Sequence, residues 1–366
     1  MSVDATTKAP EPEGRAPVTT GGGQATAGHH QSTAPAEPPK GSGLGTLLGG
    51  SASRNLGLVI ALVILCVVGI ITAGDRFASI DNAMTILRFA AVIGVVSVGM
   101  TFVIGGGGID LSVGAIVALS SVWATTLASQ ALAADTHWVL MVFTALAVGA
   151  GCGLVNGVLI AYGRIAPFIA TLAMLAAARG LAEIIAQRRT QLVTAENRGF
   201  VDFFGGSVLG VPVLVLIFVL VAIGGWVLLN RTTFGRRTLA VGGNPEAARL
   251  AGIKVQRQTA YLYILLGVAC GLAAVMLIAR TTTGTSTHGQ LLELDAIAAV
   301  VIGGTLLSGG RATIVGTVFG VLIFATLTNV FTLNNLDTST QAVAKGVIII
   351  AAVLLQQRVA SRRRSP

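Results

Sequence analysis

The sequence predicts an all-α integral membrane protein, a polytopic helical bundle of about ten transmembrane helices. Composition is the first reason: of 366 residues, 53% are hydrophobic and only 11% charged, and the mean hydropathy is +0.81. Apolar runs are the second reason, because they recur from Leu56 onward and most approach the roughly 20 residues that cross a hydrocarbon core. The 47 glycines are the third, since small residues let membrane helices approach closely.

Ten apolar runs are predicted to cross the membrane. The eighth is too short to cross alone, so we expect it to begin near Leu291. An even number of crossings places both termini on the same side. The predicted spans are 56–73, 89–104, 111–128, 139–161, 168–186, 208–229, 260–279, 296–307, 314–333 and 342–355.

Basic residues choose that side, because cytoplasmic loops carry an excess of lysine and arginine. One cluster lies in the loop 230–258 and another near the C-terminus, with Arg164 and Arg311 in short loops that agree. We therefore expect both termini in the cytoplasm, Lys254 and Arg363 inside, and the segment 188–202 outside. The net charge of +9 reflects this orientation and contact with anionic membrane lipid. Nothing resembles a nucleic-acid binder.

The chain divides into a membrane domain with two polar ends. Residues 1–53 are rich in Pro, Gly, Thr, Ala and Ser, which predicts a disordered cytoplasmic tail. We interpret the adjacent His29 and His30 in this tail as solvated, with a metal site as the alternative. Residues 54–358 form the membrane domain and 359–366 a basic cytoplasmic tail. The cysteines lie singly in different runs, with neither disulfide nor metal-ligand spacing.

The run GGGGIDLSVG places Asp110 and Ser112 between two apolar spans. A charge at membrane depth costs roughly 2.5–3.5 kcal/mol on insertion scales, so it marks a helix end or a transport path. We favour Asp110 as a helix cap, with a path residue as the alternative, and the same two alternatives apply to Asp295.

Two polar residues lie inside predicted spans. Asn156 and Arg179 are candidates for the translocation path or for contacts between helices. Arg179 has two further alternatives, snorkelling to the interface or pairing with Glu183 one turn on. His288, in the polar run TTTGTSTHGQ, is predicted to be solvated.

A candidate internal repeat relates GGIDLSVG at 107–114 to GGRATIVG at 309–316. Both copies share the leading glycines and the closing Val-Gly, and each joins two apolar runs. Transporter folds are often built from such repeats. Chance is the alternative, because glycine-rich membrane sequences give short matches of this kind.

Energy must come from outside the chain. No GxxxxGK[ST] phosphate loop is present, so the chain does not bind ATP in that manner. The intramembrane acid–base chains of a proton pump are also missing. We expect no enzymatic activity, no cofactor and no metal.

The loop 230–258 contains the second informative motif, GGNPEAARLAG. Asn244 is placed to cap a helix that has Pro245 in its first turn, Glu246 near its positive end and Gly252 after it. A short helix at the cytoplasmic face suits docking into another protein. The alternative is a solvated loop helix whose basic residues only fix topology.

Four blocks in order resemble the permease subunits of ribose/xylose-type ABC importers: GGIDLSVGAIVALSS, NGVLIAYGRIAPFIATLAMLAAARGLA, FGRRTLAVGGNPEAARLAGI and ELDAIAAVVIGGTLLSGGRATIVGT. The resemblance covers about residues 77–355 and implies a homodimer in the bacterial inner membrane. It also implies a cytoplasmic ATP-binding subunit and an extracytoplasmic sugar-binding protein that delivers a monosaccharide. The EAAxxxG pattern is similar to the element that docks on the ATPase, which here comprises Gly243, Asn244, Glu246, Ala247, Ala248, Arg249 and Gly252.

Other functions stay open at this point. A permease of the same class for a nucleoside or a signal sugar is the first alternative. An ion-coupled secondary transporter and a membrane enzyme are the others. The docking helix favours the importer, because only a protein driven from outside needs one.

Overall fold

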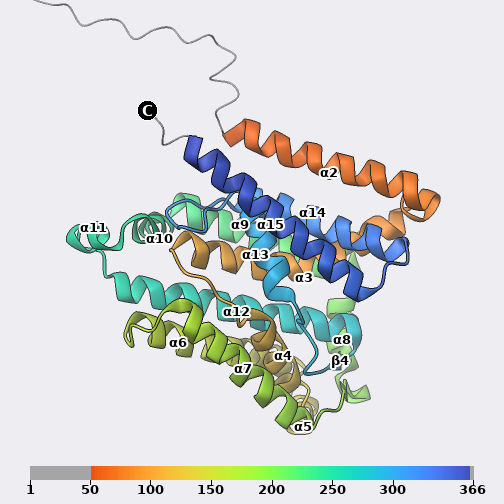
Figure 1. Cartoon of the computed structure of the whole chain (residues 1–366). Coiled ribbons are helices and arrows are strands. Elements are labelled where there is room, and N and C mark those ends of the chain that lie inside the picture. Colours follow the sequence, from red (N-terminus) through yellow and green to blue (C-terminus); the bar gives the residue numbers. More distant parts are fainter. Residues whose placement is uncertain (1–50, 363–366) are drawn as a thin grey trace, which may run out of the picture. The chain divides into compact units, whose positions relative to one another are not determined.

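The computed structural model describes residues 51–362, and these residues are almost entirely helical (Figure 1). Long apolar segments form helices because a helix satisfies every backbone hydrogen bond within one segment. The helices are α2 (Ser51–Ala73), α3 (Ile80–Gly105), α4 (Val113–Ala124), α5 (Leu127–Asp135), α6 (Val139–Ala161), α7 (Pro167–Ala186), α8 (Arg198–Gly205), α9 (Val213–Arg231), α10 (Thr233–Gly243), α11 (Pro245–Leu250), α12 (Val255–Thr281), α13 (Leu292–Ile302), α14 (Ile314–Leu333) and α15 (Thr338–Arg362).

Short elements complete the described part. Single turns of 3-10 helix are formed by η1 (Gly74–Arg76) and η2 (Ala195–Asn197). The strands β1 (Gln191–Leu192) and β4 (Thr283–Gly284) pair antiparallel, as do β2 (Ser207–Val208) and β3 (Val211–Pro212).

The prediction of an all-α membrane protein agrees with this architecture, but the count of ten spans is not confirmed. Within the described residues seven helices are long and apolar enough to cross a membrane, or up to eight if the bent pair α4 and α5 is one span. The seven are Leu56–Arg76, Ile80–Gly105, Val139–Ala161, Pro167–Ala186, Val213–Arg231, Val255–Thr281 and Ile314–Leu333.

Three predicted spans differ from the structure in an informative way. The third ends at Ala124, where the chain bends by 54° into α5. The sixth begins at Val213, because the residues before it form the β2–β3 hairpin. The eighth begins at Leu292, close to the predicted start, but α13 has only 11 residues and a length of about 16 Å, roughly half of a hydrocarbon core.

Each of the short helices α4 and α13 is preceded by a non-helical segment. Residues 106–112 lead into α4 and residues 285–291 lead into α13. The second segment runs along α4: a Cβ added to Gly284 would lie 2.7 Å from the backbone oxygen of Ser121 near the end of α4. A Cβ added to Gly289 would lie 3.0 Å from the Cα of Gly114 near its start. We call α4 and α13 with their leading segments the broken spans.

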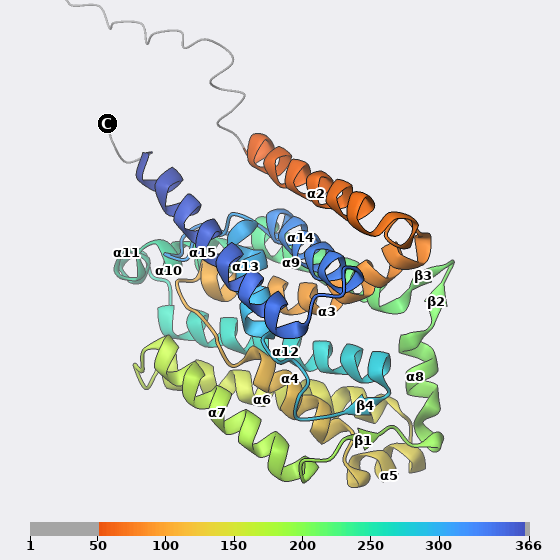
Figure 2. The same cartoon turned by 45° about the vertical axis from the view of Figure 1, so that its right-hand side comes forward.

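Helix α12 lies at the centre of the bundle, against α3, α4 and α6 (Figure 2). Its contact with α6 is close because glycines face each other: a Cβ on Gly153 would lie 3.1 Å from the Cα of Gly267. This agrees with the role predicted for the glycines. Small residues bring membrane helices together where no hydrophobic driving force exists.

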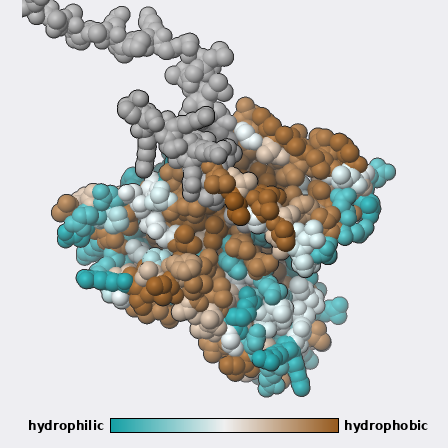
Figure 3. Space-filling model, viewed as in Figure 1, coloured by the Kyte–Doolittle hydropathy of each residue, from teal (hydrophilic) through white to brown (hydrophobic). Residues whose placement is uncertain are grey.

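The two ends of the bundle differ. Helices α10 and α11 lie at one end, while α8 and the two small sheets lie at the other (Figures 1 and 2). Apolar atoms cover much of the visible face between polar ends (Figure 3). At the α8 end, Phe200, Phe203 and Phe204 of α8 pack against Trp138, with the ring centroids of Trp138 and Phe203 5.4 Å apart. Aromatic residues are typical of the membrane–water interface.

The predicted terminal tails fall largely outside the described residues. Residues 1–50, with His29 and His30, and residues 363–366 are not described. Helix α2 begins at Ser51, so the last three residues of the predicted N-terminal tail are helical. Helix α15 continues to Arg362, so the predicted basic tail starts within a helix.

The α11 end and the α8 end are predicted to face opposite sides of the membrane, the α11 end being cytoplasmic. Single cysteines at Thr190 and Lys254, both exposed, test this in a background without Cys66, Cys152 and Cys270. We expect a membrane-impermeant thiol reagent added to intact cells to label residue 190 only, because basic loops stay inside. Residue 254 should be labelled only after the cells are permeabilised. Labelling of both residues from outside would contradict the predicted orientation.

Candidate functional site

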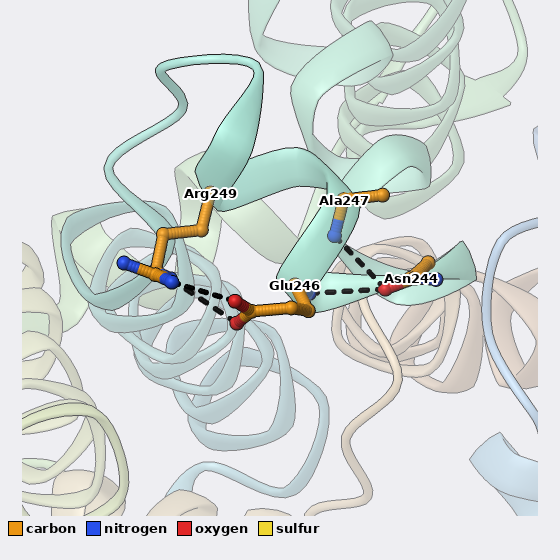
Figure 4. Close-up of polar contacts among 4 residues, drawn as sticks. All are labelled: Asn244, Glu246, Ala247 and Arg249. Carbon is orange, nitrogen blue, oxygen red and sulfur yellow. Dashed lines mark hydrogen bonds and ion pairs between the residues drawn. The ribbon is translucent and has the colours of Figure 1, made fainter.

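The predicted docking helix is present as α11. The side chain of Asn244 accepts hydrogen bonds from the backbone N–H groups of Glu246 and Ala247, both at 3.0 Å (Figure 4). Pro245 occupies the first turn, and Gly252, at φ +80°, follows the helix. The predicted cap is therefore confirmed, and it fixes a helix that is too short to be stable alone.

Helix α11 exposes two opposite charges. The guanidinium of Arg249 donates to both carboxylate oxygens of Glu246, at 3.1 and 2.6 Å, in a forked arrangement (Figure 4). This hydrogen bonding holds the pKa of Glu246 below its ordinary value and raises that of Arg249, so both groups are charged at neutral pH. Their side chains remain about two-thirds exposed, at 65% and 64%, so the pair adds little stability. It orders two charges at a surface that a partner can reach.

A cavity of about 220 Å³ opens beside α11. Its walls come from parts of the chain far apart in sequence: the loop after α3, the joint between α10 and α11, and the ends of α6, α7 and α12. Its lining includes Gly107, Gly108, Val241, Pro245 and Tyr263. The cavity therefore lies between α11 and the segment that carries Asp110.

Asp110, Ser112 and Asn156 form one buried polar cluster. The Asp110 carboxylate accepts from the Ser112 backbone N–H at 2.7 Å and from its hydroxyl at 2.5 Å. The Asn156 amide of α6 donates to Ser112 Oγ at 3.0 Å and to Asp110 Oδ2 at 3.3 Å, while its own Oδ1 has no hydrogen-bond partner within the described chain. All three side chains are at most 1% exposed.

The geometry corrects the favoured prediction that Asp110 caps a helix. Residue Ser112 is the N-cap of α4, and its side chain caps no helix N–H. Asp110 instead bonds the N–H of the N-cap residue itself, which holds the turn into α4. Among the described residues, no group of three or more His, Cys, Asp and Glu side chains could hold a metal ion.

Arg179 does not pair with Glu183, which corrects one predicted alternative. Its side chain reaches from α7 to residues 285–291, the non-helical segment before α13. There it donates to the backbone oxygens of Ser286 and His288, the latter at 3.0 Å. Glu183 lies 3.6 Å from Arg188 instead. Arg179 thus supplies donors to carbonyl groups that no helix satisfies.

His288 is buried, which overturns the prediction that it is solvated. Its side chain is hydrogen-bonded to Ser121 of α4 at 3.1 Å and to Thr281 of α12 at 3.3 Å. From the non-helical segment before α13, His288 therefore connects α4 and α12. The polar composition of this run suggested a surface loop, and only the packing along α4 explains its burial.

Asp295 is not part of the Asp110 cluster and has a partner that the sequence did not indicate. Lys345 of α15 donates to its carboxylate at 3.0 Å, and the two side chains are only 15% and 19% exposed. Fifty residues separate them, so no local pattern indicates the contact. The structure brings together Asp110, Ser112 and Asn156, and leaves Arg179 and Asp295 at separate contacts.

A helical membrane protein with broken spans and an exposed, capped helix at one end has the architecture of a transport permease. The chain belongs to the family described as "Branched-chain amino acid transport system / permease component", whose model matches residues 82–353. It is 44% identical over 303 residues to the ribose import permease of Bacillus subtilis (strain 168), covering 83% of this chain and 91% of that protein.

Two further sugar permeases are similar to the chain over most of its length. The L-arabinose ABC transporter permease of Azospirillum brasilense is 40% identical, covering 84% of this chain and 89% of that protein. The fructose import permease of Rhizobium meliloti is 37% identical, with 84% and 86% covered. No solved structure matches the chain. The chain is a multi-pass cell-membrane protein and a transport subunit, as the sequence predicted.

Replacing Asp295 by Asn should destabilise the protein by about 3 kcal/mol, because it leaves the Lys345 ammonium without its partner in a largely buried site. Thermal unfolding of the purified protein in detergent measures the loss. The double variant Asp295→Asn/Lys345→Met removes both charges and should recover most of the stability. An unchanged melting temperature in Asp295→Asn would contradict the importance of the pair.

Asp110→Asn should keep most of the transport rate. An Asn oxygen still accepts from the Ser112 N–H, and a rotated Asn156 amide can present its free Oδ1 to the new donor. Asp110→Leu removes the acceptor and should assemble poorly. Uptake by reconstituted protein and yield after size exclusion separate the two effects, and a well-assembled Asp110→Asn protein without transport would show that the charge itself is required.

Proposed function

We propose that this chain is the membrane-spanning permease subunit of an ABC importer for a monosaccharide. A separate cytoplasmic subunit hydrolyses ATP, an extracytoplasmic binding protein delivers the sugar, and two copies of the chain form the pathway in the bacterial inner membrane, with both termini cytoplasmic. The observation that carries the proposal is α11, a capped and charged helix at the surface of a sugar-permease relative. The named substrates of the relatives, ribose, arabinose and fructose, favour a sugar over a nucleoside.

Helix α11, with Gly243 and Gly252 at its ends, is the element that docks on the ATPase. Ala248 is buried against the chain, whereas Glu246 and Arg249 face outward. A partner with complementary charges can therefore read the outer face without disturbing the inner one. An ion-coupled transporter that works alone has no need of this surface.

The translocation path passes beside the broken spans. The donors of the cluster Asp110, Ser112 and Asn156 are paired with one another, and the free acceptor Oδ1 of Asn156 suits a hydroxyl group of the solute. Arg179 stabilises residues 285–291, the non-helical segment before α13, and the Asp295–Lys345 pair joins α13 to α15. The cavity beside α11 is the release side of this path.

The charges of α11 provide the test. Glu246→Arg and Arg249→Glu, each alone, should abolish ATP-driven sugar uptake and lower ATP hydrolysis by the assembled complex, while membrane insertion stays normal. The reason is that each places a like-charge pair on the docking face. Uptake of radiolabelled ribose, arabinose and fructose into proteoliposomes with the ATPase and the binding protein measures the effect.

A charge swap separates docking from helix stability. Glu246→Arg/Arg249→Glu restores the ion pair within α11 but reverses the charges shown to a partner. If the helix only needs its internal pair, the swap rescues uptake; if it docks, uptake stays lost. Asp135→Arg, exposed at the end of α5, is the matched control and should transport normally. Normal uptake in both single variants of α11 would refute the docking role.

A further inference from the structure

We infer that three glycine-containing backbone segments form a relay that carries movement of α11 into the membrane domain. The segments are Gly242–Gly243 at the joint between α10 and α11, Gly105–Gly107 at the end of α3, and Gly309–Gly310 before α14. We call them the glycine junction. The inference rests on the proposed function, because it assigns a route to the coupling that α11 begins.

The three segments touch backbone to backbone. The Gly310 N–H donates to the Gly105 carbonyl oxygen at 3.0 Å. A Cβ on Gly242 would collide with that same oxygen and lie 2.8 Å from the Gly310 nitrogen. A Cβ on Gly309 would lie 2.6 Å from the Gly242 oxygen and 2.9 Å from the Gly107 Cα. No side chain separates the segments, so none can yield when one of them moves.

The backbone conformation explains why glycine is needed here. Gly107 and Gly309 have φ values of +85° and +78°, a region that residues with a Cβ rarely adopt. They are the leading glycines of the two copies of the candidate repeat, GGIDLSVG and GGRATIVG. The motif found in the sequence therefore marks two segments that meet each other and α11's neighbour Gly242.

Each segment lies within a few residues of a different element: α11, the Asp110 segment or α14. Gly243 precedes Asn244, the cap of α11. Gly107 lies three residues before Asp110, on the segment that leads into α4. Gly310 lies three residues before Thr313, the cap of α14, and α14 bonds back to α3 through Thr317 and Thr101 at 2.8 Å.

These connections make the junction a mechanical contact and not only a tight fit. Packed backbone has low compressibility, so a displacement of one segment is passed to its neighbours. The junction also borders the cavity beside α11, which Gly106, Gly107 and Val241 line. Movement of α11 would therefore reshape the release side and reach the Asp110 segment together.

Gly242→Ala tests the relay in the complex with the ATPase and the binding protein, with uptake and ATP hydrolysis measured on the same proteoliposomes. The added methyl group forces the segments apart without altering the docking face. We expect the amount of sugar transported per ATP to fall about tenfold, while ATP hydrolysis continues. Gly151→Ala and Gly224→Ala are matched controls, since no atom lies within 4 Å of an added Cβ, and they should keep the parent ratio.

A disulfide tests whether the segments move as one body. The Thr101 and Thr317 hydroxyl oxygens lie 2.8 Å apart between α3 and α14, so Thr101→Cys/Thr317→Cys tests this in a background without native cysteines. A rigid relay predicts the same uptake before and after oxidation. Uptake that stops on oxidation and returns on reduction overturns the relay, because the segments would then have to slide. If Gly242→Ala fails to assemble, the disulfide measurement tests the relay in its place.

Other outcomes separate the relay from the proposed function. An unchanged ratio of sugar to ATP in Gly242→Ala, with parent uptake that depends on ATP, overturns the relay and leaves the proposed function intact. Parent uptake that needs neither ATP nor the ATPase subunit overturns the proposed function, and the relay with it.

Discussion

The structure depends on one constraint: inside a membrane, every backbone N–H and C=O group must find a partner within the protein. Most of the bundle meets it with long helices. The broken spans cannot, because α4 and α13 have only 12 and 11 residues and are preceded by non-helical chain. The rest of the architecture supplies what these segments lack. Asp110 accepts from the backbone before α4, and Arg179 donates to the carbonyls before α13.

The same constraint explains where the polar side chains lie. A span with no break needs no polar partner for its backbone, and the long helix α9 is accordingly apolar up to Asn230 and Arg231 at its end. Arg179 and His288 instead gather around residues 285–291, where the backbone is open. Asp110, Arg179 and His288 therefore bind other parts of the protein, and any role toward a solute is added to that structural one.

Local features of the fold could be predicted from the sequence. The cap of α11 needed only Asn244, Pro245 and the spacing to Glu246, because capping acts over two or three residues. The all-α membrane class likewise follows from composition. The start of α13 was placed within one residue, since a polar run ends there and an apolar one begins.

Features set by long-range packing could not be predicted. Hydropathy alone extended the third and eighth spans too far, because apolar residues such as Leu111 and Leu307 are half-buried in loops and not part of a helix. His288 looked solvated because its neighbours in sequence are polar, whereas its neighbours in space are α4 and α12. Asp295 gave no sign of Lys345, which lies on the last helix of the described chain.

The Asp295–Lys345 pair has a consequence for how the protein is made. Helix α15 leaves the ribosome after α13, and Lys345 is a charge within its apolar stretch. Entering lipid with an unpaired charge is costly, so α15 gains from inserting where α13 already presents Asp295. Until then Asp295 is itself unpaired. The later helix thereby supplies the partner of a carboxylate that the earlier helix carries, so the two helices reach their stable positions together.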